Sequence, residues 1–311
     1  MRVQLEAVTD ELRRLRATGV EQVYVSDETL AHLRKVTARH QVEAGPPSEE
    51  FPSVREEMAA PAPERKQVSR ATSAGVAGGG GLRWDGQPIA PLPEPPAVEL
   101  PKGSKAEQMA WLRERVLNCP VCREHIRPTG QIVFGVGSSE AEIFFCGEGP
   151  GADEERQGEP FVGPAGQLLT RIIQAMGLAR EQVYIGNIMK WRPEMPTEWG
   201  NREPTLAEVE FSLPYLRAQL AIVQPKVIVA LGKTAVNGLL GHDPARRMGA
   251  VRGRWHEFAG IPLMPTFHPS YLLRNPAMSA KRQVWEDMLL VMERVGMPVS
   301  EKQRGFFQGA K

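Results

Sequence analysis

Apolar residues in the last two-thirds of the chain follow two alternating patterns. Helical spacing predicts helices at 107–116, 165–176, 205–222, 234–240 and 280–294. Short apolar runs between these segments predict strands at 131–134, 142–146, 182–188, 226–231 and 261–267. Strands that alternate with helices predict an α/β fold, in which a mostly parallel central sheet is covered on both faces.

The first hundred residues have a different pattern. Apolar residues at helical and then alternating spacing predict that residues 1–40 form a small N-terminal accessory segment with helix and strand. Residues 41–104 are expected to be a disordered linker, because proline and glycine make up 19 of the 61 residues from 44 to 104. The folded domain is therefore placed at 105–296 and a C-terminal tail at 297–311.

Composition narrows the class of protein only a little. The formal net charge is +1, but residues 226–282 carry nine Lys and Arg against two acidic residues. Such a segment can form a phosphate-binding surface or simply a solvated face. Three cysteines define no disulfide framework, and no signal-like or membrane-length apolar run occurs. These features predict a soluble cytoplasmic protein.

Four segments place chemically useful residues at the ends of predicted strands. The run at 142–146 leads into GEGPG, which puts Glu148 at a strand tip, and Phe161 follows in the same loop region. Asn187 ends the strand at 182–188, and His268 follows the last strand. Each residue alone could have a purely structural role, as a turn, a paired amide or a loop histidine. Since the carboxyl ends of parallel strands meet at one edge of a sheet, their convergence favours a binding site.

These segments also resemble a known family. GEGPG, RQGEPFVGPAGQLL, YIGNIMKWRP, PKVIVALG, VRGRW and FHPSYLLRNP occur in the order and near the spacing of the family-four uracil-DNA glycosylases of bacteria and archaea. The resemblance covers residues 107–294. It implies the three-layer α/β/α sandwich of the uracil-DNA glycosylase superfamily, in agreement with the pattern of strands and helices.

The resemblance implies a role for each residue of the predicted site. As catalytic residues, Glu148 would orient water and favour the positive sugar, while His268 would donate a hydrogen bond to O2 of the departing base. Uracil binding falls to Gly149, Phe161 and Asn187. The Phe161 ring would stack on a base flipped out of the duplex. The Asn187 amide donates and accepts, which matches O4 and N3–H of uracil.

The resemblance further implies a surface that contacts DNA. Ser270 is expected to touch phosphate, and the loop from Tyr271 to Arg274 to enter the space left by the flipped base. Glu154 stands where it would help to exclude the methyl group of thymine. The complete set of expected DNA-contacting residues is Ser270, Tyr271, Leu272, Arg274, Arg252 and Arg254.

The cysteines depart from the family pattern. Family members carry four cysteines that bind an iron–sulfur cluster. Cys119 and Cys122 match the first two as a C-x-x-C pair and are the vestigial metal residues. Trp191 and Ser212 stand at the third and fourth ligand positions. We therefore expect that the 4Fe–4S cluster is lost and that the protein has no cofactor.

Together these observations predict a monofunctional DNA glycosylase of base-excision repair. It would hydrolyse the N-glycosidic bond of uracil in DNA and leave an abasic site. The alternatives are a weak or inactive DNA-damage-binding module of the same fold, and a glycosylase for another deaminated base. Uracil-containing DNA is the expected partner, with other repair proteins reached through residues 1–104. A monomer without membrane contact is expected.

Overall fold

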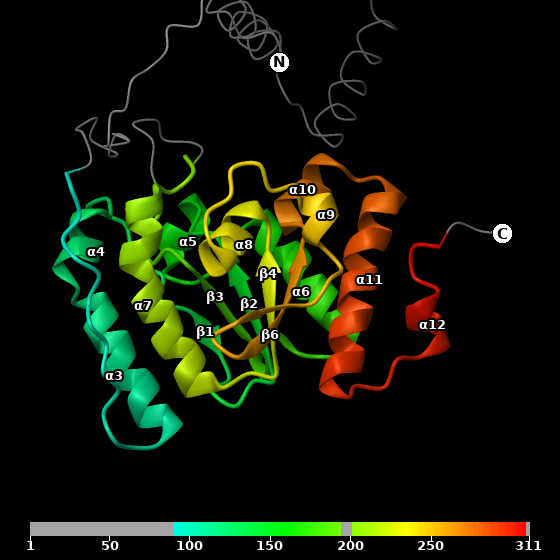
Figure 1. Ribbon diagram of the computed structural model, residues 1–311, viewed down its shortest axis with the longest axis horizontal. Coiled ribbons are helices and arrows are strands. Elements are labelled where there is room, and N and C mark those ends of the chain that lie inside the picture. Colours follow the sequence, from blue (N-terminus) through cyan, green and yellow to red (C-terminus); the bar gives the residue numbers. More distant parts are fainter. Residues whose placement is uncertain (1–89, 194–200, 309–311) are drawn as a thin grey trace, which may run out of the picture. The chain divides into compact units, whose positions relative to one another are not determined.

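The computed structural model describes residues 90–193 and 201–308 (Figure 1). The accessory segment predicted at 1–40 lies outside the described residues, as does most of the linker predicted at 41–104.

A six-stranded sheet forms the centre of the described domain. Its strands lie in the spatial order β1-β3-β2-β4-β6-β5. Their bounds are β1 Val136–Gly137, β2 Ile143–Gly147, β3 Tyr184–Asn187, β4 Val227–Leu231, β5 His256–Phe258 and β6 Ile261–Thr266. The four inner strands pair in parallel, and β1 and β5 pair antiparallel at the two edges. The sheet is thus mostly parallel, as the sequence predicts.

Two details of the predicted strand pattern were wrong. Residues 131–134 do not form a strand, although Ile132, Val133 and Phe134 are buried and the Val133 N–H donates to the Lys190 carbonyl at 2.8 Å. Their apolar character reflects burial beside the sheet rather than pairing within it. The edge strand β5 was not predicted, because only Phe258 among its three residues is buried.

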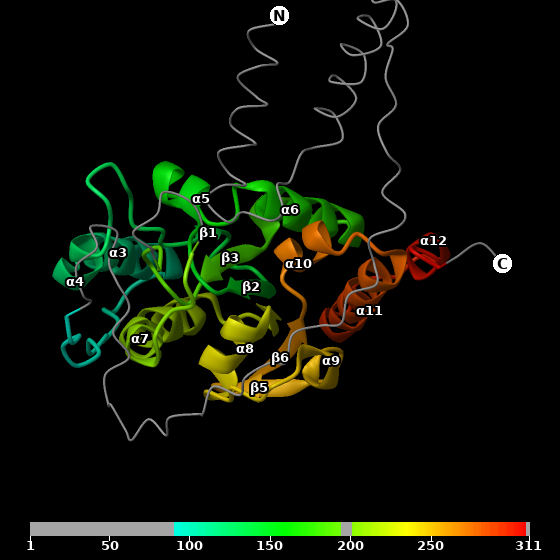
Figure 2. The ribbon, with the colours of Figure 1, turned by 90° about the horizontal axis from the view of Figure 1, so that it is seen from above.

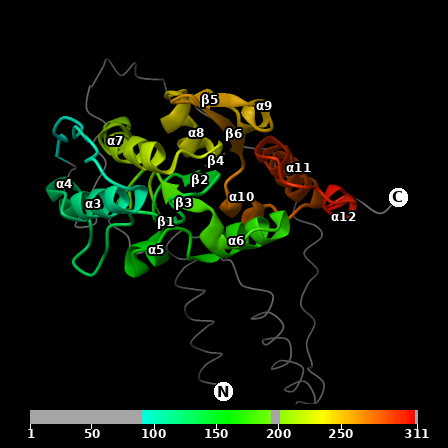
Figure 3. The same cartoon turned by 90° about the horizontal axis from the view of Figure 1, so that it is seen from below.

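Helices cover both faces of the sheet. One face is covered by α3 (Lys105–Leu117), α7 (Leu206–Val223) and α8 (Lys233–Leu240), and the other by α6 (Pro164–Met176) and α11 (Met278–Val295). Figure 3 shows the sheet between α7 and α8 on one side and α6 on the other. Each face has its own cluster of buried apolar residues, because successive strand residues point to opposite faces. The α/β/α sandwich is confirmed.

Short helices connect the main elements. Figure 2 shows α5 beside α6, and α10 between α6 and α11. The short helices are α4 Pro120–Glu124, α5 Ala152–Gln157, the 3-10 turn η1 Arg180–Gln182, α9 Met248–Val251, α10 Pro269–Arg274 and α12 Glu301–Arg304. Both α5 and α10 directly follow strand ends, so they determine where the loops of the predicted site lie.

Segments on either side of the predicted domain also pack against it. Leu92, Val98 and Leu100 lie against the core, and Arg115 donates to the Ala97 carbonyl at 3.1 Å. At the other end, the Trp285 indole N–H donates to the Gln303 carbonyl at 2.6 Å. The packed region therefore includes residues from Leu92 onward, before the boundary placed at 105, and it extends into the segment treated as a tail as far as Phe306.

Within the residues that the model describes, no helix combines the length and apolar character needed to cross a membrane.

Candidate nucleobase-binding site

Gly147 forms the floor of the predicted site. It ends β2 and pairs with Asn187 at the end of β3. A Cβ at this position would lie 2.3 Å from Asn187 Oδ1 and 2.6 Å from Cζ of Phe161. Real Cβ atoms do not come so close to other atoms, so only glycine lets the amide and the aromatic ring meet over this strand end.

Asn187 is buried with an unused hydrogen-bond acceptor. The residue is 2% exposed, and within the described part of the chain its Oδ1 has no hydrogen-bond partner. Buried polar atoms are nearly always paired, and an unpaired one costs free energy. An acceptor left open beside an aromatic ring is suited to a ligand that brings its own N–H group.

Lys190 fixes the backbone of Asn187, a role that the sequence analysis missed. Its ammonium is fully buried and donates to the Asn187 carbonyl at 2.8 Å and to Gln219 Oε1 at 2.7 Å. Burial lowers the pKa of Lys190 to about 8. Because both partners are acceptors, the lysine ties the end of β3 to helix α7 while it remains protonated at neutral pH.

Phe161 presents its ring to the same space. Its side chain is 6% exposed, and its ring centroid lies 5.6 Å from that of His268, with the planes tilted by 32°. The residue has a φ of 55°, which is uncommon for a residue other than glycine. This conformation brings an aromatic face from the loop after α5 over the end of β2.

His268 precedes α10 and is held in one tautomer. Its Nδ1 accepts hydrogen bonds from the Ser270 backbone N–H at 3.2 Å and from the Ser270 hydroxyl at 2.8 Å. Burial, aided by the positive charge of Arg274, lowers the pKa of His268 to about 4. A neutral ring whose Nδ1 accepts must carry its proton on Nε2. The residue is thus a neutral hydrogen-bond donor at physiological pH.

Glu148 lies in the turn after β2. Burial raises the pKa of its carboxyl group, a hydrogen bond with the Thr234 side chain opposes this, and the charge of Glu203 reinforces it. The Glu148 carbonyl accepts from the Met189 N–H at 3.0 Å, and a Cβ on Gly149 would lie 3.1 Å from Met189 Cβ. The turn is therefore packed closely against the chain that follows Asn187.

The residues predicted to contact DNA fall into two groups. Ser270, Tyr271, Leu272 and Arg274 all belong to α10. Within this helix Leu272 is 5% exposed and packs inward, whereas its neighbour Leu273 is 46% exposed. The exposed apolar side chain of this helix is therefore that of Leu273, which the sequence analysis did not single out.

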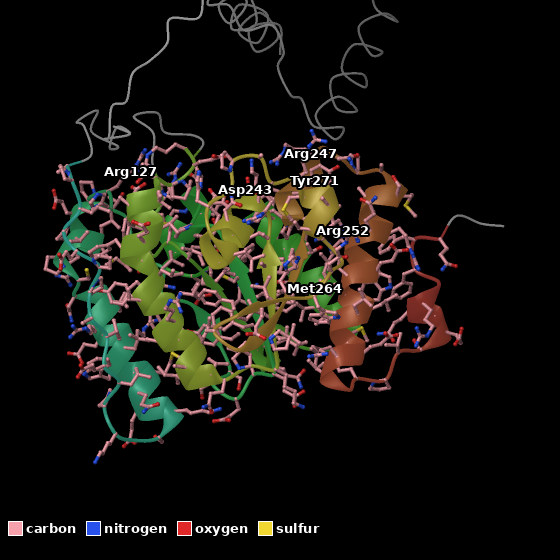
Figure 4. All side chains as sticks on the ribbon, viewed as in Figure 1. Arg127, Asp243, Arg247, Arg252, Met264 and Tyr271 are labelled. Carbon is pink, nitrogen blue, oxygen red and sulfur yellow. The ribbon has the colours of Figure 1, made fainter. Side chains whose placement is uncertain are left out.

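The two predicted arginines differ from one another. Arg254 is exposed, whereas the Arg252 guanidinium forms an ion pair with the buried Asp287, whose carboxylate also accepts from Thr266 at 2.6 Å. Figure 4 shows Tyr271 and Arg247 toward the upper end of the view and Arg252 lower, beside α11. Arg252 thus ties the end of α9 to α11, and its contact with DNA remains a prediction.

The residues at the four predicted cluster positions do not fit a 4Fe–4S cluster. Cys119 and Cys122 are buried free thiols, but Trp191 and Ser212 offer a buried indole and a buried hydroxyl. Each iron of such a cluster needs a soft ligand, normally a thiolate. Across the described ranges, no group of three or more His, Cys, Asp or Glu side chains could hold a metal ion.

Aromatic packing occupies the neighbourhood of this cysteine pair. The Trp191 ring lies 5.1 Å from that of His125 and 6.0 Å from that of Phe211, measured between centroids. Trp191 is 1% exposed and belongs to the same core cluster as Cys119 and Cys122. The chain therefore fills with side chains a region where the predicted family pattern would place ligands.

Comparisons with known proteins agree with this geometry. Residues 134–289 match the family model described as the uracil DNA glycosylase superfamily. The chain is 41% identical over 186 residues to the type-4 uracil-DNA glycosylase of Thermotoga maritima, covering 60% of this chain and 93% of that protein. It is 35% identical over 207 residues to the type-4 enzyme of Archaeoglobus fulgidus, covering 65% and 98% respectively.

A third relative, from Pyrobaculum aerophilum, is also a type-4 uracil-DNA glycosylase, with 38% identity over 178 residues that cover 55% of this chain and 88% of the relative. The residues matched by the family model, 134–289, include the GEGPG turn and the segments that carry Phe161, Asn187 and His268. The chain belongs to the uracil-DNA glycosylase superfamily, in its type-4 family.

Proposed function

We propose that this protein removes uracil from DNA by hydrolysing the N-glycosidic bond, and so leaves an abasic site for base-excision repair. The observation that carries the proposal is the open Oδ1 of Asn187, buried beside the ring of Phe161 and floored by Gly147. The names of the type-4 relatives support the same activity. We also propose that the protein acts in the cytoplasm, as its sequence predicts.

Base selection follows from the chemistry of the open amide. The Asn187 Oδ1 accepts from N3–H of uracil, while its Nδ2 donates to O4. Cytosine has an acceptor at N3 and a donor at the exocyclic amine, which is the reverse pattern. The ring of Phe161 stacks on whichever flipped base enters, so the amide determines which base is retained.

Bond cleavage requires stabilisation of two opposite charges. Negative charge develops on the departing uracil, and the Nε2–H of His268 donates to O2 of that base. A neutral histidine suits this role, because it donates a hydrogen bond without having to transfer a proton. Positive charge develops on the sugar, where the Glu148 carboxylate stabilises it and orients the attacking water.

The test is excision of uracil from a labelled oligonucleotide, followed by alkali to cut at abasic sites. Wild-type protein should give an alkali-dependent product with uracil but not with thymine or cytosine. Without alkali the strand should remain intact, because hydrolysis of the N-glycosidic bond by water leaves the sugar–phosphate backbone uncut. Glu148→Gln and His268→Ala should each slow excision by roughly a hundredfold or more, with DNA binding retained.

Two results would contradict the proposal. Full activity in both variants would remove Glu148 and His268 from the mechanism. Binding to uracil-containing DNA without excision by wild-type protein would favour a damage-binding module. Release of another deaminated base, such as hypoxanthine, in place of uracil would assign a different substrate to the same site.

A further inference from the structure

The backbone of Phe161 has a conformation that its own sequence does not favour. A φ of 55° is sparsely populated by residues that carry a Cβ, and it persists only where surrounding contacts impose it. Gly166 permits the conformation, because a Cβ there would lie 1.8 Å from the Phe161 carbonyl oxygen. Absence of a clash does not hold the loop in place, so specific contacts must do so.

Glu154 supplies such contacts on the C-terminal side of Phe161. Its Oε1 accepts hydrogen bonds from the N–H groups of Val162 and Gly163, both at 3.0 Å. Its Oε2 accepts from the Gly151 N–H at 3.1 Å, in the GEGPG turn. One carboxylate therefore joins the turn that carries Glu148 to the loop that carries Phe161. Hydrogen bonds from backbone N–H groups to a carboxylate are among the stronger ones in proteins.

Arg180 holds the other side of the loop. Its guanidinium donates to the Pro160 carbonyl, directly before Phe161, and to the Thr170 hydroxyl at 3.2 Å. That hydroxyl donates in turn to the Gly166 carbonyl at 3.1 Å. The residues on both sides of Phe161 are thus bound by charged side chains from two separate elements, α5 and the turn η1.

We propose that Glu154 and Arg180 are positioning residues that together hold Phe161 in its base-stacking conformation. The proposal rests on the proposed function for its consequence in catalysis. Both carboxylate oxygens of Glu154 are engaged with backbone N–H groups, so the residue acts through the loop rather than by touching the base. Loss of either side chain frees the loop to relax to a more favourable φ, and the ring then leaves the position over Gly147.

A double-mutant cycle tests this route of action. Single-turnover excision is measured for wild type, Phe161→Ala, Glu154→Ala and the double variant, below the melting temperature of each. Glu154→Ala should slow excision roughly tenfold or more alone, and by less than about twofold in the Phe161→Ala background. Arg180→Met should behave in the same way. Glu154→Gln should lie between wild type and Glu154→Ala, because its carbonyl oxygen still accepts from the loop.

A matched control removes a neighbouring charge that does not hold the loop of Phe161. Arg156 lies in α5 with Glu154, and its exposed guanidinium pairs with Asp153, so Arg156→Gln should excise uracil at the wild-type rate. Equal, additive losses from Glu154→Ala in both backgrounds would overturn the proposal, because Glu154 would then act independently of the ring.

A second readout does not depend on activity. Hydrogen exchange of the amides at Val162 and Gly163 should be at least tenfold faster in Glu154→Ala, while that of Ile185 in β3 should be unchanged. Unchanged exchange at Val162 and Gly163 would refute the positioning role of Glu154 even if activity fell. If wild-type protein failed to excise uracil but exchange responded as expected, the proposed function would fail and the positioning role would stand.

Discussion

Replacing Trp191 with alanine should lower the free energy of unfolding by about 3–5 kcal/mol, the usual cost of emptying a fully buried aromatic site. The ring is 1% exposed and lies 5.1 Å from His125 and 6.0 Å from Phe211, between centroids. No small movement of these neighbours can fill a space the size of an indole. For a domain of this size, each kcal/mol corresponds to about 2–4 °C, so the melting temperature should fall by roughly 6–20 °C.

Urea and thermal unfolding, followed by circular dichroism, would measure this effect. Trp255→Ala is the matched control, because Trp255 is 37% exposed and has one cation–π contact, with Arg294 at 5.4 Å. That control should lose no more than about 1 kcal/mol. Replacing Cys119 and Cys122 together with alanine should also be mild, at about 1–2 kcal/mol, because two small side chains are shortened by one atom each.

A loss below about 1 kcal/mol for Trp191→Ala would refute the reasoning, since it would mean that the ring does not hold this region together. Stoichiometric iron in anaerobically purified protein would refute the conclusion that this chain holds no 4Fe–4S cluster, and would require ligands other than those at the four family positions. Iron content and unfolding can both be measured on aliquots of the same preparation.

Four further predictions concern the site and the domain boundary. As the pH falls, protonation of Glu148 should slow excision before protonation of His268 does, because burial raises the pKa of Glu148 and lowers that of His268 to about 4. Thr234→Val removes a hydrogen bond that lowers the pKa of Glu148, so it should move the acid limb of the pH–rate profile to higher pH. An unmoved limb would contradict this. The lowered pKa of His268 also affects stability, because the contribution of the neutral ring is complete above its ordinary pKa of 6.5 and is lost as the pH falls toward 4. The free energy of unfolding of His268→Ala should therefore decline less steeply with acid than that of wild type. Asn187→Asp should abolish uracil excision and favour slow cytosine excision, since an acceptor replaces the amide donor; unchanged uracil excision would make Asn187 purely structural. Deletion of residues 1–89 should keep both melting temperature and excision rate, whereas deletion of 1–104 should lower the melting temperature, because Leu92, Val98 and Leu100 pack on the core.

Sequence patterns predicted the parts of the fold that are fixed by local rules. A buried parallel strand must be apolar along its whole length, and Val227–Leu231 meets that rule and forms β4. The residues at strand ends were predictable for the same reason, since parallel strands bring their carboxyl ends together. Glu148, Phe161, Asn187 and His268 do lie around the same edge of the sheet.

The features that the sequence did not reveal depend on partners far along the chain. Arg252 reads as a surface base until Asp287, 35 residues away, is seen to bind it. The sequence shows Lys190 only as one residue of the segment after Asn187, and its bond to Gln219 of helix α7 is seen only in the structure. No periodicity predicts such pairs, because the side chains meet only after the elements have packed.

The glycine at position 147 has a genetic consequence. Its φ is not in the left-handed region, so the requirement for glycine comes from the lack of space and not from the backbone conformation. Any side chain would occupy the space in which the Asn187 amide and the Phe161 ring meet. Missense alleles at this codon should therefore leave uracil in the genome, and those that place a large or charged side chain in the buried strand should lower the amount of folded protein as well.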